Sequence, residues 1–368
     1  MKIVYVITQG SWGGAQAHLY DLLETQTNAG NDIYLITGTK GRLTEQVGSE
    51  LPQVKQIWLK NLQRSISILN DARAIYQIRR LLNTIQPDIV HLHSSKAGTL
   101  GRLAAIKLVP TVFTVHGWAF TDGVSKKRAI LALLIERLMQ PLTTHYICVS
   151  QYDYQLGQQK KLLNHRHSGT VVHNGVKATE LVVPKMNRIF RVTMAARFNE
   201  QKRQDLLIRA FAGFSAKYEC RLVLLGDGPY LERCRELVYD LGLEDKVIFK
   251  GNVQNVTVHY QETDVVALIS NYEGLPISLA EGLAAGKPLI ASHVGGVAEL
   301  FQNNGFLVKN DIEEIQQALI QLATNVQLRH QQGRNSRQLY RQLFTQQQML
   351  IKTEQVYQKL LARRTSDD

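Results

Sequence analysis

The chain has 368 residues, of which 44% are hydrophobic and 20% charged, and its formal net charge is +12. This length exceeds what one hydrophobic core usually organises, so we expect two domains, and the composition is that of a globular protein. No apolar segment approaches the roughly 20 residues that cross a bilayer, which argues against an integral membrane protein. The opening MKIVYVIT fits a buried first strand better than a signal peptide, so we expect a cytoplasmic protein.

Positive charge is concentrated in the first half of the chain. Residues 1–183 hold 20 Lys and Arg against 11 Asp and Glu, a net of +9, whereas residues 184–368 hold 23 against 20, a net of +3. A field of this sign attracts polyanions, namely nucleic acid, an anionic membrane surface or phosphorylated substrates. Because the basic residues form no long run and no nucleic-acid module is recognisable, nucleic acid is the weakest of these partners.

Short apolar runs alternate with longer amphipathic stretches along the whole chain. The runs are KIVYVIT, DIYLIT, DIVHLH, TVFTVH, HYICVS and TVVHNGV in the first half, then FRVTMAA, RLVLLGDG, KVIFKG, DVVALIS and KPLIAS. Apolar strands separated by helices are typical of parallel sheets covered on both faces, and the pattern occurs twice. We therefore predict an α/β protein with two doubly wound Rossmann-like domains, 1–183 and 184–346. The junction is expected near residues 180–187, and residues 347–368 are expected to form a last helix with a disordered tail from Thr365.

A glycine-rich loop follows the first predicted strand. Gly10, Gly13 and Gly14 in TQGSWGGAQAHLYDLL precede a helix, so the backbone can approach a phosphate or a sugar without an intervening side chain. The spacing G-x-x-G-G differs from the dinucleotide fingerprint G-x-G-x-x-G, and no acidic residue ends the second strand. The competing interpretation is a plain turn.

Polar residues also follow two later strands of the first half. His116 comes directly after TVFTV, where a histidine can hydrogen-bond a sugar hydroxyl or a phosphate, or can be a satisfied structural residue. In HLHSSKAGTLGRLAA, the polar groups that follow the strand and fit an acceptor are His93, Ser94, Ser95 and Lys96. Lys96 and Arg102 are basic enough for a phosphate, and a helix cap is the competing interpretation of the serines.

In the second half, two cations lie around a turn that leads into a helix. Arg197 and Lys202 follow the strand FRVTMAA, and together they suit a diphosphate whose negative charge grows as it leaves. A solvated basic turn is the alternative. After the next strand, Gly226 and Gly228 permit a tight turn, and Asp227 is placed to cap the following helix.

The most informative segment is NYEGLPISLAEGLAAGKP, which predicts a loop entering a short helix that stops at Gly286. Its carboxylates, Glu273 and Glu281, are at most about 12 Å apart along a helix axis, the span from ribose to hexose in a nucleotide sugar. The backbone N–H groups of Gly274, Leu275, Pro276 (which lacks one) and Ile277 mark the helix start, where unpaired donors face a bound diphosphate. A solvated face with two unrelated glutamates is the competing interpretation.

Several motifs are absent from the sequence. It has no D-x-D, H-E-x-x-H or paired C-x-x-C, so we expect no metal requirement. It has neither a G-x-S-x-G elbow nor a P-loop, which disfavours hydrolases and NTPases. Its three cysteines, Cys148, Cys220 and Cys234, lack metal-ligand spacing and are expected to be buried thiols rather than a disulfide framework.

Taken together, these motifs resemble the retaining glycosyltransferases of the GT-B fold, in particular family 4 (group 1), over nearly the whole chain. The resemblance lies in the first glycine loop, HSSKAGTLGRLAA, TVHGWAF, H-N-G-V, Arg197 with Lys202, GDGP, and EGLPISLAE followed by G-x-P and GG-x-x-E. HSSKAG with VHGWAF is most similar to enzymes that build bacterial exopolysaccharide, capsule or O-antigen units on a lipid diphosphate carrier.

The resemblance implies a central cleft between the two domains and a role for each motif. Arg197 and Lys202 would hold the donor diphosphate, Glu273 and the backbone after it the transferred sugar, and Glu281 the ribose. His116 would touch the sugar from the acceptor-binding first domain. The remaining implied donor contacts are Gly13, Gly14, Gly226 and, near the base, Val253. The last helix would pack back on the first domain, and the leaving diphosphate, rather than a protein nucleophile, would help deprotonate the acceptor.

We therefore expect a metal-independent, retaining hexosyltransferase that uses a nucleotide-diphosphate sugar, most simply a UDP-sugar, without a cofactor. Its acceptor would be a lipid-diphosphate-linked or free saccharide, and the protein would associate peripherally with the inner face of the cell membrane. Two alternatives stay open: a UDP-sugar epimerase of the same fold, and a catalytically inactive homologue that acts as an assembly subunit.

Overall fold

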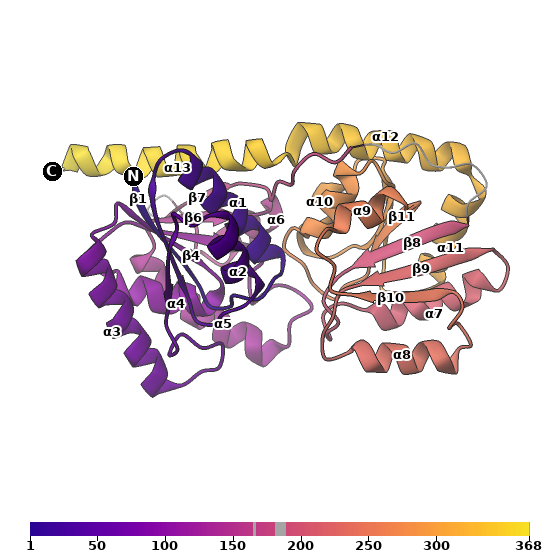
Figure 1. Cartoon of the computed structure of the whole chain (residues 1–368), viewed down its shortest axis with the longest axis horizontal. Helices are drawn as coiled ribbons and strands as arrows, with labels where there is room; N and C mark the ends of the chain where they lie inside the picture. Colours follow the sequence, from indigo (N-terminus) through magenta and orange to yellow (C-terminus); the bar gives the residue numbers. More distant parts are fainter. Residues whose placement is uncertain (165–166, 181–188, 368) are drawn as a thin grey trace. The chain divides into compact units, whose positions relative to one another are not determined.

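The chain folds into two compact units, Met1–His173 with Gln347–Asp368, and Asn174–Gln346 (Figure 1). The computed structural model describes residues 1–164, 167–180 and 189–367, with side chains as far as Ala362. The junction predicted at residues 180–187 lies mostly outside the described residues. Each unit is built on one sheet whose paired strands are all parallel.

The first unit has a seven-stranded sheet in the order β3-β2-β1-β4-β5-β6-β7. Its strands are β1 (Lys2–Ile7), β2 (Asp32–Thr37), β3 (Lys55–Trp58), β4 (Ile89–His93), β5 (Thr111–Val115), β6 (His145–Cys148) and β7 (Ser168–Val171). Its helices are α1 (Gly14–Asn28), α2 (Arg42–Glu50), α3 (Ile68–Ile85), α4 (Ser95–Ala104), α5 (Lys126–Met139), the 3-10 helix η1 (Gln140–Leu142), α6 (Gln151–Gln159) and α13 (Gln346–Asp367).

Helices cover both faces of this sheet (Figure 1). Along β1, Val4 and Val6 face a core that also contains buried side chains of α3 and α4 and partly buried side chains of α5. Ile3, Tyr5 and Ile7 face the other core, which is closed by α1, α2 and α13. Since successive strand residues point to opposite faces, a strand buried on both sides must be apolar throughout, which explains the run KIVYVIT.

The second unit has a six-stranded sheet in the order β10-β9-β8-β11-β12-β13. Its strands are β8 (Phe190–Ala195), β9 (Cys220–Leu225), β10 (Val247–Gly251), β11 (Val265–Leu268), β12 (Leu289–Ser292) and β13 (Gly305–Val308). Its helices are α7 (Gln204–Ser215), α8 (Leu231–Asp240), α9 (Val256–Gln261), α10 (Ile277–Ala284), the 3-10 helix η2 (Gly295–Leu300), α11 (Ile312–Thr324) and α12 (Val326–Leu343).

The α/β class and the eleven predicted strands are confirmed, but the structure has two further strands that were not predicted. Both β3 and β13 are four residues long and lie at the edge of their sheets. Every residue of β3 is exposed or only partly buried, and β13 is fully buried at Val308 alone. An edge strand needs no continuous apolar run, so periodicity does not reveal it. The three cysteines are free and buried, as expected.

The last helix, α13, belongs to the first unit. Its residues Met349, Val356 and Leu360 are buried in the core with α1 and α2. Tyr357 lies beneath them, with its hydroxyl 3.1 Å from that of Tyr5 and 2.5 Å from Nδ1 of His91. The helix continues to Asp367, so the tail predicted to be disordered from Thr365 is helical up to that residue.

Candidate functional site

Each sheet has a point where the strand order reverses, and the predicted site residues follow the strands on either side of it. In the first sheet the reversal lies between β1 and β4, and in the second between β8 and β11. Loops beyond the carboxyl ends of such strands form the usual ligand crevice of an open α/β sheet. Lys202 follows β8 and Glu273 follows β11, so both lie at the second reversal.

The two loops at the second reversal are joined by hydrogen bonds. Gln201 donates its side-chain N–H to the carbonyl of Tyr272 at 2.7 Å and accepts from the backbone N–H of Asn271 at 2.8 Å. Asn271 in turn donates its side-chain N–H to the carbonyl of Glu200 at 3.0 Å. This pairing fixes the position of Lys202 relative to Glu273, although 71 residues of sequence separate them.

Lys202 and Glu273 form an ion pair through Nζ and Oε1. The side chains are only 16% and 8% exposed, so this pair is largely removed from water. Each charge is stabilised there by the other, because an unpaired, largely buried charge is costly. A ligand that carries both phosphate and hydroxyl groups can replace the pair by contacting Lys202 with its phosphate and Glu273 with its hydroxyls.

Glu273 leads into the start of α10. Pro276 is the N-cap residue and makes no side-chain cap hydrogen bond, so the first-turn N–H groups depend on other partners. The loop itself is held from below by Asn174, a buried residue whose side-chain N–H donates to the carbonyl of Leu275 at 2.7 Å. Asn174 was noted in the sequence only as part of the H-N-G-V motif, and its positioning role was not predicted.

Gly295 lies against the backbone of Glu273. It has φ = +52°, and a Cβ added there would be 1.9 Å from the Glu273 carbonyl oxygen. The next residue, Gly296, donates its N–H to the carbonyl of Gly274 at 3.1 Å. Only glycine permits this conformation and this approach, so Gly295 determines where the Glu273 backbone lies. The sequence motif GG-x-x-E contained this residue, but no role was assigned to it.

The loop that carries Arg197 is packed against a second glycine turn. A Cβ on Gly226 (φ = +128°) would lie 2.2 Å from the Ala196 carbonyl oxygen, and one on Gly228 would lie 2.2 Å from that of Phe198. Arg197 itself is exposed. The prediction that Asp227 caps α8 is wrong, because its carboxylate accepts from the N–H of Gly228 at 2.6 Å, whereas Tyr230 is the N-cap residue.

Glu281 and Val253 are the remaining predicted donor contacts of this unit. Glu281 lies on α10, four residues after Ile277 and half-buried. Its carboxylate is close enough to α9 to raise the pKa of Tyr260, although burial of that phenol is the larger cause. Val253 lies just after β10, in the loop before α9, and is half-buried. Their contacts with ribose and base stay predictions.

In the first unit, three histidines meet at the carboxyl edge of the sheet. His93 ends β4 and His116 follows the adjacent β5, with His93 Nδ1 3.0 Å from His116 Nε2. The ring of His18, on α1, is nearly perpendicular to that of His116, with 5.0 Å between centroids. His18 was not singled out from the sequence, although its place in the first turns of the helix after β1 was a usable signal.

The imidazoles of His93 and His116 are held neutral. Burial first, and then the neighbouring histidines His18 and His91, lower the pKa of His116 well below its ordinary value. Burial likewise lowers the pKa of His93, with smaller contributions from His91, His116 and His18. A neutral imidazole donates one hydrogen bond and accepts another. His116 is therefore suited to a sugar hydroxyl rather than to charge neutralisation of a phosphate.

The same three rings are the candidate metal ligands within the described part of the chain. One ring nitrogen from each of His18, His93 and His116 lies within 4.8 Å of the others, and three imidazoles can hold a transition-metal ion such as Zn²⁺. His93 and His116 already bond to each other, so an ion would have to replace that hydrogen bond. The expectation that no metal is required stays a prediction.

The glycine loop after β1 lies at the same reversal point. Gly13 is the N-cap of α1 and provides no side-chain cap, and Gly14 is the first helical residue. Next to this loop, Thr8 Oγ1 lies 2.9 Å from Ser94 Oγ. Ser94 has φ = +74° and makes no side-chain cap hydrogen bond to α4, so the helix-capping interpretation fails for Ser94. The contact of Gly13 and Gly14 with a donor stays a prediction.

Arg102 does not offer a phosphate site. It is fully buried, and its guanidinium forms a two-point ion pair with Glu136, with both N–O distances at 2.9 Å. Lys96 is also occupied, by an ion pair with Asp71 at 2.5 Å. The sequence predicted both as phosphate ligands because it could not reveal partners that lie 34 and 25 residues away.

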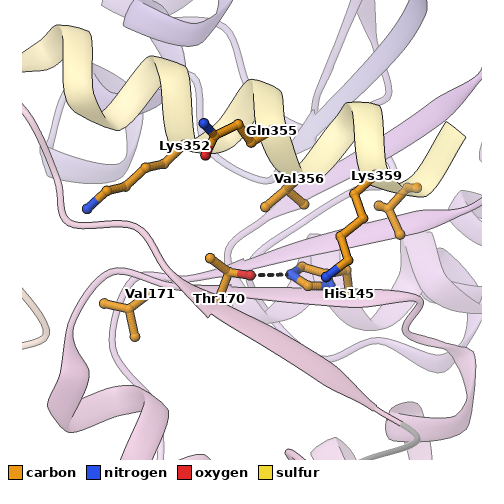
Figure 2. Close-up of a pocket in the computed structure, with 8 residues that line it drawn as sticks. His145, Thr170, Val171, Lys352, Gln355, Val356 and Lys359 are labelled. Atoms are coloured by element: carbon orange, nitrogen blue, oxygen red, sulfur yellow. Dashed lines mark hydrogen bonds between the residues drawn. The ribbon is translucent and has the colours of Figure 1, made fainter. Parts of the chain in front are cut away.

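A separate pocket of about 330 Å³ lies between α13 and the edge of the first sheet (Figure 2). Lys352 and Lys359 extend from α13 on either side of Val356, and His145 and Thr170 lie opposite. Thr170 Oγ1 is 2.9 Å from His145 Nε2, so these two groups satisfy each other. None of the predicted site residues lines this pocket, which therefore is not part of the candidate site.

Solved structures with the same architecture define the fold. HepE of Anabaena in complex with UDP and glucose superposes with a TM-score of 0.80 at 20% identity, covering 97% of this chain and 99% of HepE. Sucrose-phosphate synthase of Thermosynechococcus elongatus gives a TM-score of 0.84 at 18% identity, covering 99% and 100%. The fold is the GT-B fold of glycosyltransferases.

Sequence relatives then define the family. Residues 12–180 match the model of Glycosyltransferase Family 4, and residues 183–339 match that of Glycosyl transferases group 1. The UDP-Gal:alpha-D-GlcNAc-diphosphoundecaprenol alpha-1,3-galactosyltransferase of Escherichia coli is 30% identical in an alignment of 352 residues that covers 88% of this chain and 88% of the relative. The E. coli O-antigen biosynthesis glycosyltransferase WbnH is 26% identical over 333 residues, 85% of this chain and 88% of WbnH. The chain belongs to the group 1 glycosyltransferases of family 4, and the resemblance drawn from its motifs is confirmed.

Proposed function

We propose that this glycosyltransferase moves a hexose or N-acetylhexosamine, with retention, from a UDP-sugar to a lipid-diphosphate-linked or free saccharide in the synthesis of a cell-surface polysaccharide. The observation that carries the proposal is the Lys202–Glu273 ion pair at the start of α10, fixed by two hydrogen-bonded loops at the strand-order reversal. It combines, in one unit, a cation for a diphosphate and a carboxylate for sugar hydroxyls.

The proposed donor is supported from two sides. HepE was crystallised with UDP and glucose, and the E. coli relative is named for transfer from UDP-Gal. In this chain, Lys202 and Arg197 would neutralise the charge that develops on the leaving diphosphate, while the N–H groups at the start of α10 add their dipoles. Glu273 would bind the transferred sugar and Glu281 the ribose, and Gly13, Gly14, Gly226 and Val253 would line the donor.

The proposed acceptor follows from the relatives and from His116. The E. coli relative is named for an acceptor on diphosphoundecaprenol, and WbnH for O-antigen biosynthesis. The neutral His116 would hydrogen-bond the sugar undergoing transfer, whereas no side chain acts as a covalent nucleophile. The catalytic contribution of the protein would then be positioning and electrostatic stabilisation.

We further propose that the enzyme acts without a metal ion in the cytoplasm, associated with the inner face of the membrane. Within the described residues, no helix has the length and apolarity to span a bilayer. The +9 charge of residues 1–183 supports attraction to anionic lipid.

A donor screen tests the proposal. Purified protein is incubated with single UDP- and GDP-sugars and a membrane extract that contains lipid-linked acceptors, and transfer is detected as a mass shift of the acceptor. We expect one UDP-sugar to give a product whose linkage retains the anomeric configuration, and chelators to leave the rate unchanged. Loss of transfer on chelation, restored by a divalent ion, would contradict metal independence.

Two controls separate the alternatives. Incubation with donor alone, followed by sugar analysis, would reveal a new sugar nucleotide if the protein were an epimerase. Calorimetry with UDP and UDP-sugars would detect no binding if the protein were an inactive assembly subunit. The ion pair of Lys202 and Glu273 is retained in this chain, which supports an enzyme over that second alternative.

A further inference from the structure

Helix α5 presents an aliphatic face to solvent. Ile130, Leu131, Leu134 and Leu138 are 62%, 51%, 51% and 71% exposed. At 3.6 residues per turn these positions fall within one arc of about 100°, so they form a continuous stripe. Large aliphatic side chains that gather in such a stripe indicate an interaction surface, whereas single exposed ones do not.

The opposite side of α5 is firmly attached to the first unit. Glu136 is buried, and its two carboxylate oxygens accept hydrogen bonds from the two terminal nitrogens of Arg102 on α4, each N–O distance being 2.9 Å. Arg102 also donates to the carbonyl of Gly98 at 2.8 Å, which completes its anchorage within α4. Met139 is buried as well. Because these contacts fix the rotation of the helix, its aliphatic stripe is a permanent part of the surface.

The charges of α5 are arranged around this stripe. Lys126, Lys127, Arg128 and Arg137 are all exposed. Glu136, the single acidic residue of this fully described helix, points inward to Arg102. The outer face therefore consists of aliphatic and cationic side chains without an exposed carboxylate.

A second helix of the same layer has the same character. On α3, Leu69, Arg73, Tyr76 and Arg80 are exposed at positions i, i+4, i+7 and i+11, so they share one face. Both α3 and α5 pack with α4 on one side of the first sheet, where their inner residues share a core (Figure 1). Apolar and basic side chains thus recur across neighbouring helices of this layer.

We propose that the outer face of α5, supported by the α3 stripe, is the surface by which this protein docks on an anionic lipid bilayer. Aliphatic side chains among Lys and Arg suit the boundary between acyl chains and anionic headgroups, where the stems of the basic residues lie beside lipid and their charges reach phosphate. A protein partner or a second copy would have to supply acidic groups opposite four exposed cations, whereas anionic lipid supplies them throughout its surface. The inference rests on the proposed function in one respect: a lipid-linked acceptor would be reached from this surface.

Vesicle flotation tests the inference without donor or acceptor. Wild-type protein is mixed with vesicles of phosphatidylcholine alone, or of phosphatidylcholine with phosphatidylglycerol, and the floating fraction is measured. We expect binding to the anionic vesicles that weakens as salt is added. Each Lys or Arg removed at the surface should weaken binding by a factor of roughly five. The variant Lys126→Gln/Lys127→Gln/Arg137→Gln should therefore bind on the order of a hundredfold more weakly.

A second variant and two matched controls isolate the surface. Leu131→Ser/Leu134→Ser/Leu138→Ser keeps every charge but should also lose vesicle binding. The charge control, Arg209→Gln/Lys217→Gln/Arg235→Gln, removes three exposed cations from the second unit. Its binding to anionic vesicles should weaken much less than that of the α5 charge variant, because only long-range attraction is reduced. The aliphatic control, Val326→Ser/Leu343→Ser, changes exposed positions of α12 and should bind as wild type.

The outcomes are distinguishable. Vesicle binding by both α5 variants at the wild-type level, or equal binding of wild type to neutral vesicles, would overturn the inference. So would a dimer on size-exclusion chromatography that the serine variant alone abolishes while it still floats, since the face would then join two copies. Failure of every donor in the transfer screen would remove the proposed function but leave the flotation result unaffected.

Discussion

The polar site residues are charged in the second unit and neutral in the first. The second unit contains a largely buried ion pair, Lys202 with Glu273, whereas the first contains the neutral imidazoles of His93 and His116. A charged pair can exchange partners with a ligand that is itself charged, while a neutral imidazole can only offer hydrogen bonds. We therefore expect the second unit to neutralise the diphosphate, with Glu273 binding sugar hydroxyls, and the first unit to contribute uncharged hydrogen bonds.

The largest expected effect comes from removing the cation of the second unit. Lys202→Ala should lower the rate of sugar transfer by about 10²- to 10³-fold, the usual result of deleting one group that stabilises developing negative charge. UDP affinity, measured by calorimetry, should fall as well. The exposed Lys217 of the same unit provides the control, since Lys217→Ala should change neither quantity. A transfer rate of Lys202→Ala within threefold of the wild-type rate, a change of roughly 0.7 kcal/mol in activation free energy, would contradict the role of the second unit in neutralising the diphosphate.

Removing the partner carboxylate should distinguish binding of the sugar from binding of the nucleotide. Glu273→Ala is expected to reduce transfer by about 10²-fold, because the sugar loses a charged hydrogen-bond acceptor. UDP affinity should be equal to or tighter than that of wild type, because Lys202 is released from its ion pair. Weaker UDP binding by Glu273→Ala would show instead that the carboxylate holds the nucleotide, contrary to its assignment.

In the first unit the expected effect is smaller. His116→Ala removes one hydrogen bond from a neutral group, so transfer should fall by about 10- to 100-fold. UDP affinity should not change, because the diphosphate is assigned to the other unit. His330→Ala, an exposed histidine of the second unit, is the control. A loss of UDP affinity in His116→Ala would contradict the proposed separation of roles.

Gly295 allows the geometry behind the ion pair to be tested. Gly295→Ala should destabilise the second unit by about 1–3 kcal/mol and displace Glu273, because the new Cβ meets the Glu273 carbonyl oxygen. Gly242→Ala is the matched control, since its φ of +62° is equally unfavourable but no atom lies within 4 Å. Thermal unfolding should therefore show the larger loss for Gly295→Ala, and only that variant should lose transfer activity. Equal losses of stability would show that backbone strain alone matters.

The smallest effect concerns pH and the first unit alone. His91, His93 and His116 have lowered pKa values in the folded protein, with burial as the main cause. The unfolded chain therefore binds protons first as the pH falls below about 6.5. The stabilisation is present above that pH and is lost below it, by about 1.4 kcal/mol per pH unit for each histidine that titrates.

Tryptophan fluorescence can follow this loss selectively. Trp12, Trp58 and Trp118 are the three tryptophans of the chain, and all lie in the first unit. The urea concentration at the midpoint of unfolding, followed by their fluorescence, should decrease as the pH is lowered from about 7.5 to about 5.5. This range lies above the one in which most carboxylates titrate. His116→Ala should show a shallower dependence on pH. A midpoint that is independent of pH in this range would contradict the neutral state of the cluster.

The position of residues after the carboxyl ends of parallel strands explains how much of this site was predictable. Lys202, Glu273 and His116 follow buried strands, and periodicity predicted those strands from apolar runs alone. The structure adds that Lys202 and Glu273 touch, which depends on hydrogen bonds between loops far apart in sequence. The local sequence therefore indicated which residues lie beyond the strand ends, but not which of them pair.

Long-range partners also explain the errors. Arg102 was predicted to bind phosphate because it is basic and follows a predicted strand, yet Glu136 neutralises it inside the protein. Asn174 and Gly295 were given no role, although both position the loop after Glu273. His18 escaped notice because its relation to His116 depends on the packing of α1 against the sheet. These features arise from tertiary contacts, which composition and spacing do not encode.

The placement of α13 has a consequence for synthesis on the ribosome. The first unit needs Gln347–Asp368 to cover Tyr5 and the core around it, but those residues are made only after the entire second unit. Until then the nascent chain exposes an apolar sheet face, the kind of surface that chaperones bind. Translation past residue 346 would thus be the event that completes the earlier unit, and shortening α13 before Tyr357 should yield protein that aggregates although its first 173 residues are intact.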